Sequence, residues 1–177
     1  GKKIVWRRFS EGGETAEIFT MNVDGSDQKQ ITRMGVLSWA PFFHPSGDYV
    51  IFGSNRQGFQ NFELYIVDSH GQKEPVRVTY TEGFDSLPTF SPDGTQLSWT
   101  SNRTTDHSSH IFLGDWDDAE ARRLLGLPRV KGSTPEVAHI SAFQVPTHPE
   151  IHADDLRRHV TYLASPELEG RLTGSAG

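Results

Sequence analysis

The chain has 177 residues, of which 34% are hydrophobic, and its formal net charge is −6. The length suits one ordinary domain and part of another, and the acidic balance argues against a nucleic-acid binder, which usually carries a basic face. Cysteine is absent, which excludes disulfides, thiolate zinc sites and cysteine catalysis, and no apolar stretch approaches the ~20 residues that a membrane-spanning helix needs.

The predicted elements begin with three short strands in the first 32 residues. Segments 2–6, 17–23 and 28–32 contain β-branched and aromatic residues of the kind found in half-buried strands. Asp24-Gly25 separates the last two of them and is a typical hairpin turn, because glycine accepts a positive φ without a steric penalty.

The next two stretches of the chain repeat one longer unit. The stretch "PFFHPSGDYVIFGSNR" (41–56) and the stretch "PTFSPDGTQLSWTSNR" (88–103) share seven of their sixteen positions. Each unit has one additional strand ahead of its turn glycine, Gly47 or Gly94. Self-similarity at a fixed period is the signature of a repeat architecture. The strands predicted in these two units are 39–45, 48–52, 63–68, 76–79, 86–92, 95–99, 110–116 and 121–125.

The last of these segments poses a conflict between local and repeat signals. The stretch "DDAEARRLL" (117–125) has the composition of a helix. Its place in the repeat, however, matches the outer strands at 28–32 and 76–79. We give the register more weight than the propensity and predict a strand here.

The period of the repeat indicates the fold. Four short strands at a spacing near 45 residues are typical of the blades of a β-propeller. We therefore predict an all-β fold, a partial β-propeller of about three four-stranded antiparallel blades, with a short C-terminal helix. A β-sandwich of unrelated hairpins is the less favoured alternative, because the turns of three units align.

The first blade is expected to lack its innermost strand. Gly1 aligns with the turn glycine Gly47, so the chain is expected to be a piece of a longer protein, and the inward edge of segment 2–6 has no partner. Unpaired backbone groups cost about 1–3 kcal/mol each when buried. A second copy or the remaining part of the parent protein is the favoured source of a strand, and the segment "VAHISAFQV" (137–145) is the alternative.

The third unit resembles the repeat of TolB-like propellers. Its residues "SPDGTQLSWTSNR…HIFLGDW…RRLL" follow a family pattern of Ser-Pro-Asp-Gly, an apolar strand, Ser-x-Arg, a gap, Ile-Tyr-x-x-Asp and Leu-Thr. The resemblance covers residues 1–127 and implies a propeller, but it implies little about function. The second unit departs from the pattern at His44 and Ser46, and the first departs at "WRRFS" (6–10).

A linker and the start of a second domain are predicted after the blades. Residues 128–149 hold four prolines, which is a linker composition. Beyond them, Leu156, Val160 and Leu163 fall on one face of a predicted helix, which Ser165-Pro166 would end.

This C-terminal part resembles secreted bacterial aminopeptidases that use two co-catalytic zinc ions. The strings "DDLRRHVTYLAS" and "ELEGRLTGSAG" within residues 150–177 are similar to the N-terminal start of that domain. The resemblance implies that the zinc ligands lie downstream, so no cofactor is expected in this chain. The residues that match the entry motif of the family, and not its chemistry, are Glu167, Glu169, Arg171 and Gly174.

Three charged residues are the candidate sites for contact with a peptide or an ion. Asp85 precedes a predicted innermost strand and is expected at the mouth of the channel, and Arg56 and Arg103 end the two copies of Ser-Asn-Arg. No catalytic residue and no metal site is predicted. The histidines at 107 and 110 fit a solvated loop better than a metal site, and the acidic cluster at 115–120 fits a hairpin turn better than a calcium site.

These observations support three functional hypotheses. The first is the non-catalytic propeller portion of a secreted zinc aminopeptidase, which gates or recruits peptide substrate, while hydrolysis lies downstream. The second is a TolB-like protein–protein interaction module of the cell envelope, and the third is the propeller lid of a serine peptidase. All three imply a peptide or protein partner and an extracytoplasmic location, periplasmic or secreted.

Overall fold

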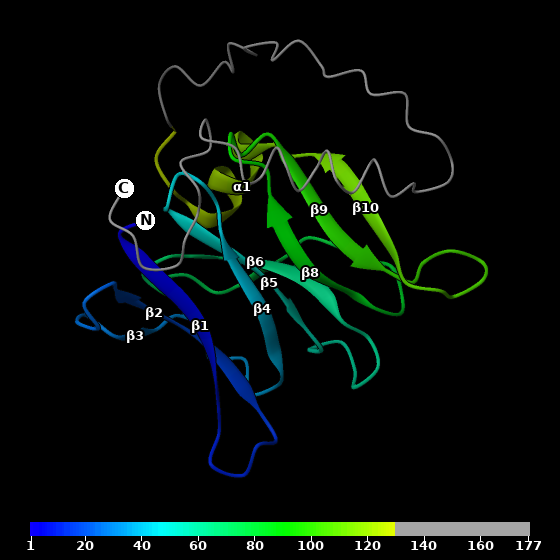
Figure 1. Ribbon diagram of the computed structural model, residues 1–177, viewed down its shortest axis with the longest axis horizontal. Coiled ribbons are helices and arrows are strands. Elements are labelled where there is room, and N and C mark those ends of the chain that lie inside the picture. The colour runs from blue at the N-terminus through cyan, green and yellow to red at the C-terminus, as the bar shows by residue number, and fades with distance from the viewer. Residues whose placement is uncertain (130–177) are drawn as a thin grey trace, which may run out of the picture. The chain divides into compact units, whose positions relative to one another are not determined.

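Three antiparallel sheets follow one another along the chain (Figure 1). The structure, a computed structural model, describes residues 1–129. Within this range the first blade holds three strands, the second four and the third three, followed by one helix. The elements are β1 (Lys3–Phe9), β2 (Ala16–Asn22), β3 (Lys29–Gln30), β4 (Ser38–Phe43), β5 (Tyr49–Ser54), β6 (Glu63–Asp68), β7 (Val76–Arg77), β8 (Asp85–Phe90), β9 (Gln96–Ser101), β10 (His110–Asp115) and α1 (Asp118–Leu125).

The second and third blades have the same strand register. Ser38 pairs with Ser54 in the second blade, and Asp85 pairs with Ser101 in the third, so both members of the pair are displaced by 47 residues. The innermost strand of each blade carries a bulge at the same place. The bulges hold two non-glycine residues at positive φ, Ala40 and Leu87. Together with the antiparallel order of the strands, this register confirms the predicted partial propeller.

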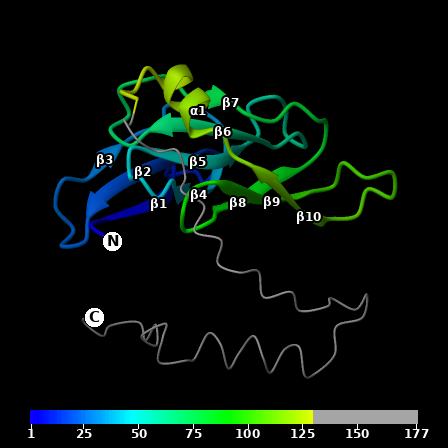
Figure 2. The same cartoon turned by 90° about the horizontal axis from the view of Figure 1, so that it is seen from above.

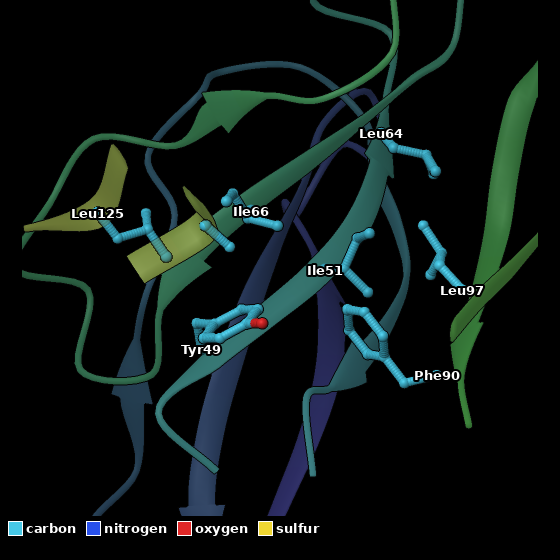
Figure 3. Close-up of a cluster of buried hydrophobic side chains, with 8 residues drawn as sticks. Tyr49, Ile51, Leu64, Ile66, Phe90, Leu97 and Leu125 are labelled. Atoms are coloured by element: carbon cyan, nitrogen blue, oxygen red, sulfur yellow. The ribbon is translucent and has the colours of Figure 1, made fainter. Parts of the chain in front are cut away.

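Hydrophobic side chains fill the layers between successive blades. One layer lies between the second and third blades, where Tyr49, Ile51, Leu64 and Ile66 meet Phe90 (Figure 3). The other layer lies between the first and second blades. Its buried residues are Ile18, Ile31, Val50, Phe52, Tyr65 and Val67. Fully burying each side chain of this kind stabilises a fold by about 1.5–3 kcal/mol, so the interfaces between blades are the main source of stability.

Segment 117–125 forms a helix, and the prediction of an outer strand there was wrong. The Asp117 side chain accepts a hydrogen bond from the Glu120 N–H at the start of α1. Gly126 ends the helix in the left-handed region, at φ 63°. Both are favoured caps. They act together with the helical propensity of this segment, to which the prediction from sequence gave less weight than to the repeat register.

The outer strands of the first two blades depend on a contact that the third blade lacks. In the second blade, the Thr79 hydroxyl donates to the Glu63 carboxylate at 2.5 Å and accepts from the Leu64 N–H. In the first blade, residues 32, 17 and 18 make the same contacts. The corresponding positions of the third blade hold Gly126 and His110, which cannot form this anchor. The segment is therefore free to form α1, which packs against β6 of the second blade.

The inward edge of the first blade lies along β1, and an incomplete first blade stays a prediction. Within residues 1–129, β1 pairs with β2 alone, so its inward edge has no strand beside it. A neighbouring copy or fragment at this edge stays a prediction. The alternative strand at 137–145 and the predicted C-terminal helix lie outside the described residues. No helix in the described part of the chain is long and apolar enough to cross a membrane.

Candidate binding site

The repeated Ser-Asn-Arg places its asparagine in a structural role. The Asn55 side-chain oxygen accepts a hydrogen bond from the Leu37 N–H at 2.9 Å, and that of Asn102 accepts from the Phe84 N–H at 2.7 Å. Each bond ties the end of the second strand of a blade to the segment that leads into its innermost strand. The asparagine is repeated because both blades need this connection.

The two arginines of the repeat have different surroundings. The Arg103 guanidinium bonds the Asp85 carboxylate at 2.6 Å, and Asp85 is 1% exposed. Arg103 also donates to the Ser101 hydroxyl at 2.9 Å. Both arginines are exposed, but the position that corresponds to Asp85 in the blade of Arg56 is Ser38. The structure therefore joins two of the three candidate residues in one ion pair and leaves Arg56 apart from them. Direct contact of these residues with a peptide or ion stays a prediction.

Arg103 also borders a pocket of about 330 Å³ between the second and third blades. The pocket is lined on one side by the segment that follows β7 and on the other by β9, β10 and the residues next to them. Arg103 lies over the rings of Trp99 and Phe112, at 5.3 and 5.2 Å from their centroids. The lining residues are Val78, Thr79, Tyr80, Thr81, Leu97, Trp99, Arg103, Gly114, Asp115 and Trp116.

A difference between repeats explains why there is room for this pocket. Gly114 of β10 corresponds to Val67 of β6, since both strands pair with their neighbours in the same register. Val67 is fully buried and fills the layer between the first two blades. The glycine offers no side chain there. A glycine inside a strand often marks a close approach by another group, and this was the signal in the sequence that could have predicted the pocket.

The pocket adjoins an unpaired strand edge. In the described part of the chain, β10 pairs with β9 on one side and with nothing on the other. Two apolar side chains of β10 are also exposed, Ile111 by 81% and Leu113 by 66%. The corresponding residues of β6, Leu64 and Ile66, are buried. The third blade therefore presents both an open edge and an uncovered apolar face.

A partly buried polar cluster joins α1 to the second blade. The Trp116 indole N–H donates to the Tyr49 hydroxyl at 2.7 Å, and this hydroxyl donates to Asp118 at 2.9 Å. Arg122 bonds both Asp118 and Asp48, at 2.8 and 2.5 Å. Burial raises the pKa of Tyr49 above its usual range, so this hydroxyl remains a donor. These bonds hold the helix in place.

His44 lies against this cluster in its neutral form. Its Nε2 is 3.3 Å from the Gly94 carbonyl oxygen, which only accepts, and its Nδ1 is 3.2 Å from the Ser46 N–H, which only donates. Its ring stacks on Tyr49, and Asp118 lies 3.8 Å away. Burial lowers the pKa of His44 below its ordinary value, although the nearby carboxylates act in the opposite direction.

The lowered pKa predicts a loss of stability in mild acid. Below pH 6.5 the unfolded chain binds a proton at His44 that the folded protein does not bind, so the free energy of unfolding should fall until the pH reaches the lowered pKa. Urea unfolding between pH 7.5 and 5.5 measures this slope. The control is His44→Ser, since the third blade has Ser91 at this position, and its slope should be shallower. Equal slopes for the two proteins would contradict the role of His44.

The acidic cluster at 115–120 serves the helix. Asp117 caps α1, Asp118 binds Arg122, and Glu120 binds Arg123 at 2.5 Å. The earlier interpretation as a hairpin turn is thus replaced by a helix N-terminus, where acidic side chains are favourable. In residues 1–129 no group of three or more His, Asp or Glu side chains is arranged to hold a metal ion.

Comparison with known proteins identifies relatives of this architecture. A family model described as "TolB beta propeller domain" matches residues 1–142. The "Tol-Pal system protein TolB" of Desulfotalea psychrophila is 30% identical over 45% of this chain and 18% of that protein. The "Protein TolB homolog" of Chlorobium chlorochromatii is 34% identical over 58% of this chain and 32% of that protein. The chain thus spans at most about a third of these relatives.

Solved structures show the same fold. A putative TolB from Agrobacterium tumefaciens superposes with a TM-score of 0.56 at 21% identity, over 65% of this chain and 42% of that one. TolB from Acinetobacter baumannii gives a TM-score of 0.55 at 24% identity, over 65% of this chain and 27% of that one. At these identities the likeness concerns the fold alone.

Proposed function

We propose, from the premise that this chain belongs to the TolB beta propeller domain family, that it acts as a protein–protein interaction module of the cell envelope. The observation that carries this proposal is the open face and edge of the third blade. Ile111 and Leu113 expose large apolar side chains on a strand that, among residues 1–129, is unpaired on one side. Exposed apolar patches of this kind mark interaction surfaces in folded proteins.

The partner is a peptide or protein, and the location is extracytoplasmic, periplasmic or secreted. One relative is named "Tol-Pal system protein TolB", and this name supports a role in an assembly of proteins. The net charge of −6 favours partners other than nucleic acids.

Capture from envelope proteins followed by titration tests this proposal. The immobilised 177-residue chain is exposed to an envelope extract, each retained protein is purified, and its affinity is measured by calorimetry. We expect at least one protein to bind with a dissociation constant below about 10 μM, which corresponds to about 7 kcal/mol. A chain heated above its unfolding temperature and cooled serves as the control for adhesion of unfolded protein. Failure of every purified candidate to bind would overturn the proposal.

A second candidate function rests on the C-terminal sequence. The resemblance of residues 150–177 to the start of zinc aminopeptidases supports a non-catalytic propeller portion of such an enzyme, which gates or recruits peptide substrate. In the complete enzyme the zinc would reside in the downstream domain. The third hypothesis, a propeller lid of a serine peptidase, has no observation of its own in the structure.

The isolated chain is expected to be inactive under this second candidate. It should neither hold stoichiometric zinc nor hydrolyse aminoacyl substrates, because none of the zinc ligands implied by the resemblance can be assigned to a residue of this chain. Metal analysis after dialysis against zinc, together with an aminoacyl-anilide assay, provides the measurement. One or two tightly bound zinc ions per chain would contradict this expectation.

A further inference from the structure

We infer that the outer edge of β10 takes up an extended strand of a partner protein, and that one apolar side chain of this strand enters the pocket above Gly114. This inference rests on the proposed interaction function and names its surface. β10 is the last strand in the row β8, β9 and β10 (Figure 2). Its outer edge, which pairs with no strand in the described part of the chain, can therefore accept a strand in the mode known as β-augmentation.

The hydrogen-bond pattern of β10 identifies the groups that are free to pair. The Trp116 N–H donates to the Thr95 carbonyl, and alternate residues of an antiparallel strand point their backbone groups to opposite sides. The N–H and C=O groups of Ile111 and Leu113 are therefore directed at the open edge. The structure records no strand beside them in residues 1–129.

The second blade shows what kind of segment fits such an edge. Leu64 of β6, which corresponds to Ile111, accepts from the Val78 N–H at 2.7 Å and donates to the Thr79 hydroxyl at 2.9 Å. Ile66, which corresponds to Leu113, pairs with Val76 of β7. The occupant of the β10 edge is thus a short antiparallel strand of the β7 type, with alternating side chains.

The register also places one side chain of the incoming strand over the pocket. If the pairing of β6 with β7 is continued by one residue, position 75 lies opposite Val67, the counterpart of Gly114. A Cβ at position 114 would lie 3.5 Å from the Trp99 ring. The pocket beyond this Cβ position is the space that a side chain of the incoming strand would enter, if that side chain occupies the position of residue 75.

The charges of the pocket favour an apolar side chain there. Arg103 is already paired with Asp85, so it offers no free cation to an acidic group. Asp115 lines the pocket and would repel a second carboxylate. Trp99, Trp116 and Leu97 provide apolar surface. A leucine-like side chain matches these walls better than a charged one.

The helix of this chain is not a competitor for the edge. α1 is held on the second blade by Arg122, which bonds both Asp118 and Asp48 and is 3% exposed. Its apolar residues Ala121 and Leu125 are buried in the layer between the blades. Moving α1 to β10 would break both sets of contacts, so the strand comes from outside this helix.

A synthetic peptide provides the test. The probe has the sequence of residues 74–81 with Pro75→Leu and Arg77→Thr, carries a fluorescent label, and is titrated into the 177-residue chain while anisotropy is measured. We expect saturable binding, and hydrogen exchange should slow at the amides of Ile111 and Leu113. The matched control peptide carries Pro75→Asp and should bind about tenfold more weakly.

Two protein variants distinguish the pocket from the neighbouring apolar face. Gly114→Val fills the pocket with the side chain that Val67 has in the second blade, and it should weaken binding of the probe about tenfold. Leu113→Thr removes apolar surface from the opposite face, and it should weaken binding of the probe less than Gly114→Val does. The circular dichroism of both variants verifies that they are folded.

Three outcomes would overturn this inference. The first is the absence of saturable binding of the probe. The second is that Leu113→Thr abolishes binding of the probe while Gly114→Val leaves it unchanged, which would place the occupant on the exposed apolar face of β10. The third is a dimer in sedimentation whose dissociation exposes the β10 amides, which would make a second copy the occupant. If a captured envelope protein binds Gly114→Val as tightly as the original chain, the proposed site is wrong but the interaction function stands. If no envelope protein binds the chain, the interaction function fails, whatever the result with the probe.

Discussion

Replacing Arg103 by methionine is expected to lower the free energy of unfolding by about 3 kcal/mol, the cost of leaving the buried Asp85 carboxylate without its charged partner. Asp85 is 1% exposed, and the Arg103 guanidinium is its side-chain partner at 2.6 Å. Methionine keeps most of the apolar stem of Arg103 and removes the guanidinium, which lies 5.3 Å from the centroid of the Trp99 ring, together with its charge. Urea unfolding followed by tryptophan fluorescence measures the change.

The repeat supplies a matched control for this experiment. Arg56 ends the same Ser-Asn-Arg sequence in the second blade, but Ser38 stands where the third blade has Asp85. Arg56→Met should therefore change the free energy of unfolding by less than about 0.5 kcal/mol. The double variant Asp85→Asn with Arg103→Met should recover part of the loss, because it removes the uncompensated charge. Equal effects of the two arginine variants would contradict the ion-pair explanation.

The second large effect is expected at Gly71, where two blades meet. Gly71 has a φ of 65°, and a Cβ at this position would lie 2.6 Å from the Ile31 Cα. Gly71→Ala should lower the free energy of unfolding by about 2–5 kcal/mol, since a left-handed alanine costs roughly 1–2 kcal/mol and overpacking adds about 1–3. The Ile31 Cα is a backbone atom, and its side chain lies in the buried layer between the two blades. It therefore cannot move aside without separating the first blade from the second.

Gly25 is the corresponding glycine of the first blade and separates these two causes. Its φ is 84°, and a Cβ there would have no atom within 4 Å. Gly25→Ala should cost only the conformational part, about 1–2 kcal/mol. The difference between the two variants, measured by urea unfolding, isolates the contact between blades. If the two alanines cost the same, the close approach at Ile31 has no energetic weight.

These two sites also bear on function. A strand that docks on β10 needs a third blade that is held firmly against the second, and Asp85 with Arg103 anchors the start of its innermost strand. The pocket is formed by residues of both blades. We therefore expect the binding geometry to depend on the packing between blades as much as on β10 itself.

The sequence by itself determined the repeat and most of the strands. The spacing of Gly47 and Gly94 fixed the register, because a positive φ is needed at the same point of each hairpin. The aliphatic and aromatic residues of β5, β6 and β9 predicted these strands close to their observed bounds. These features are local, or they repeat at a fixed interval, and either kind of signal is visible in a single chain. The domain boundaries at 127 and 149 stay predictions.

The tertiary structure alone decided that segment 117–125 is helical and that Arg103 and Arg56 have different partners. The helix forms because Asp117 and Gly126 cap it and because its outer-strand anchor is missing, a comparison that requires knowing which residues Thr79 contacts. Arg103 and Arg56 look equivalent in the sequence, and only the pairing of β8 with β9 shows that one faces a carboxylate and the other does not. Contacts between strands that are far apart in the chain set burial and ion pairing, so neither could be read from the repeat alone.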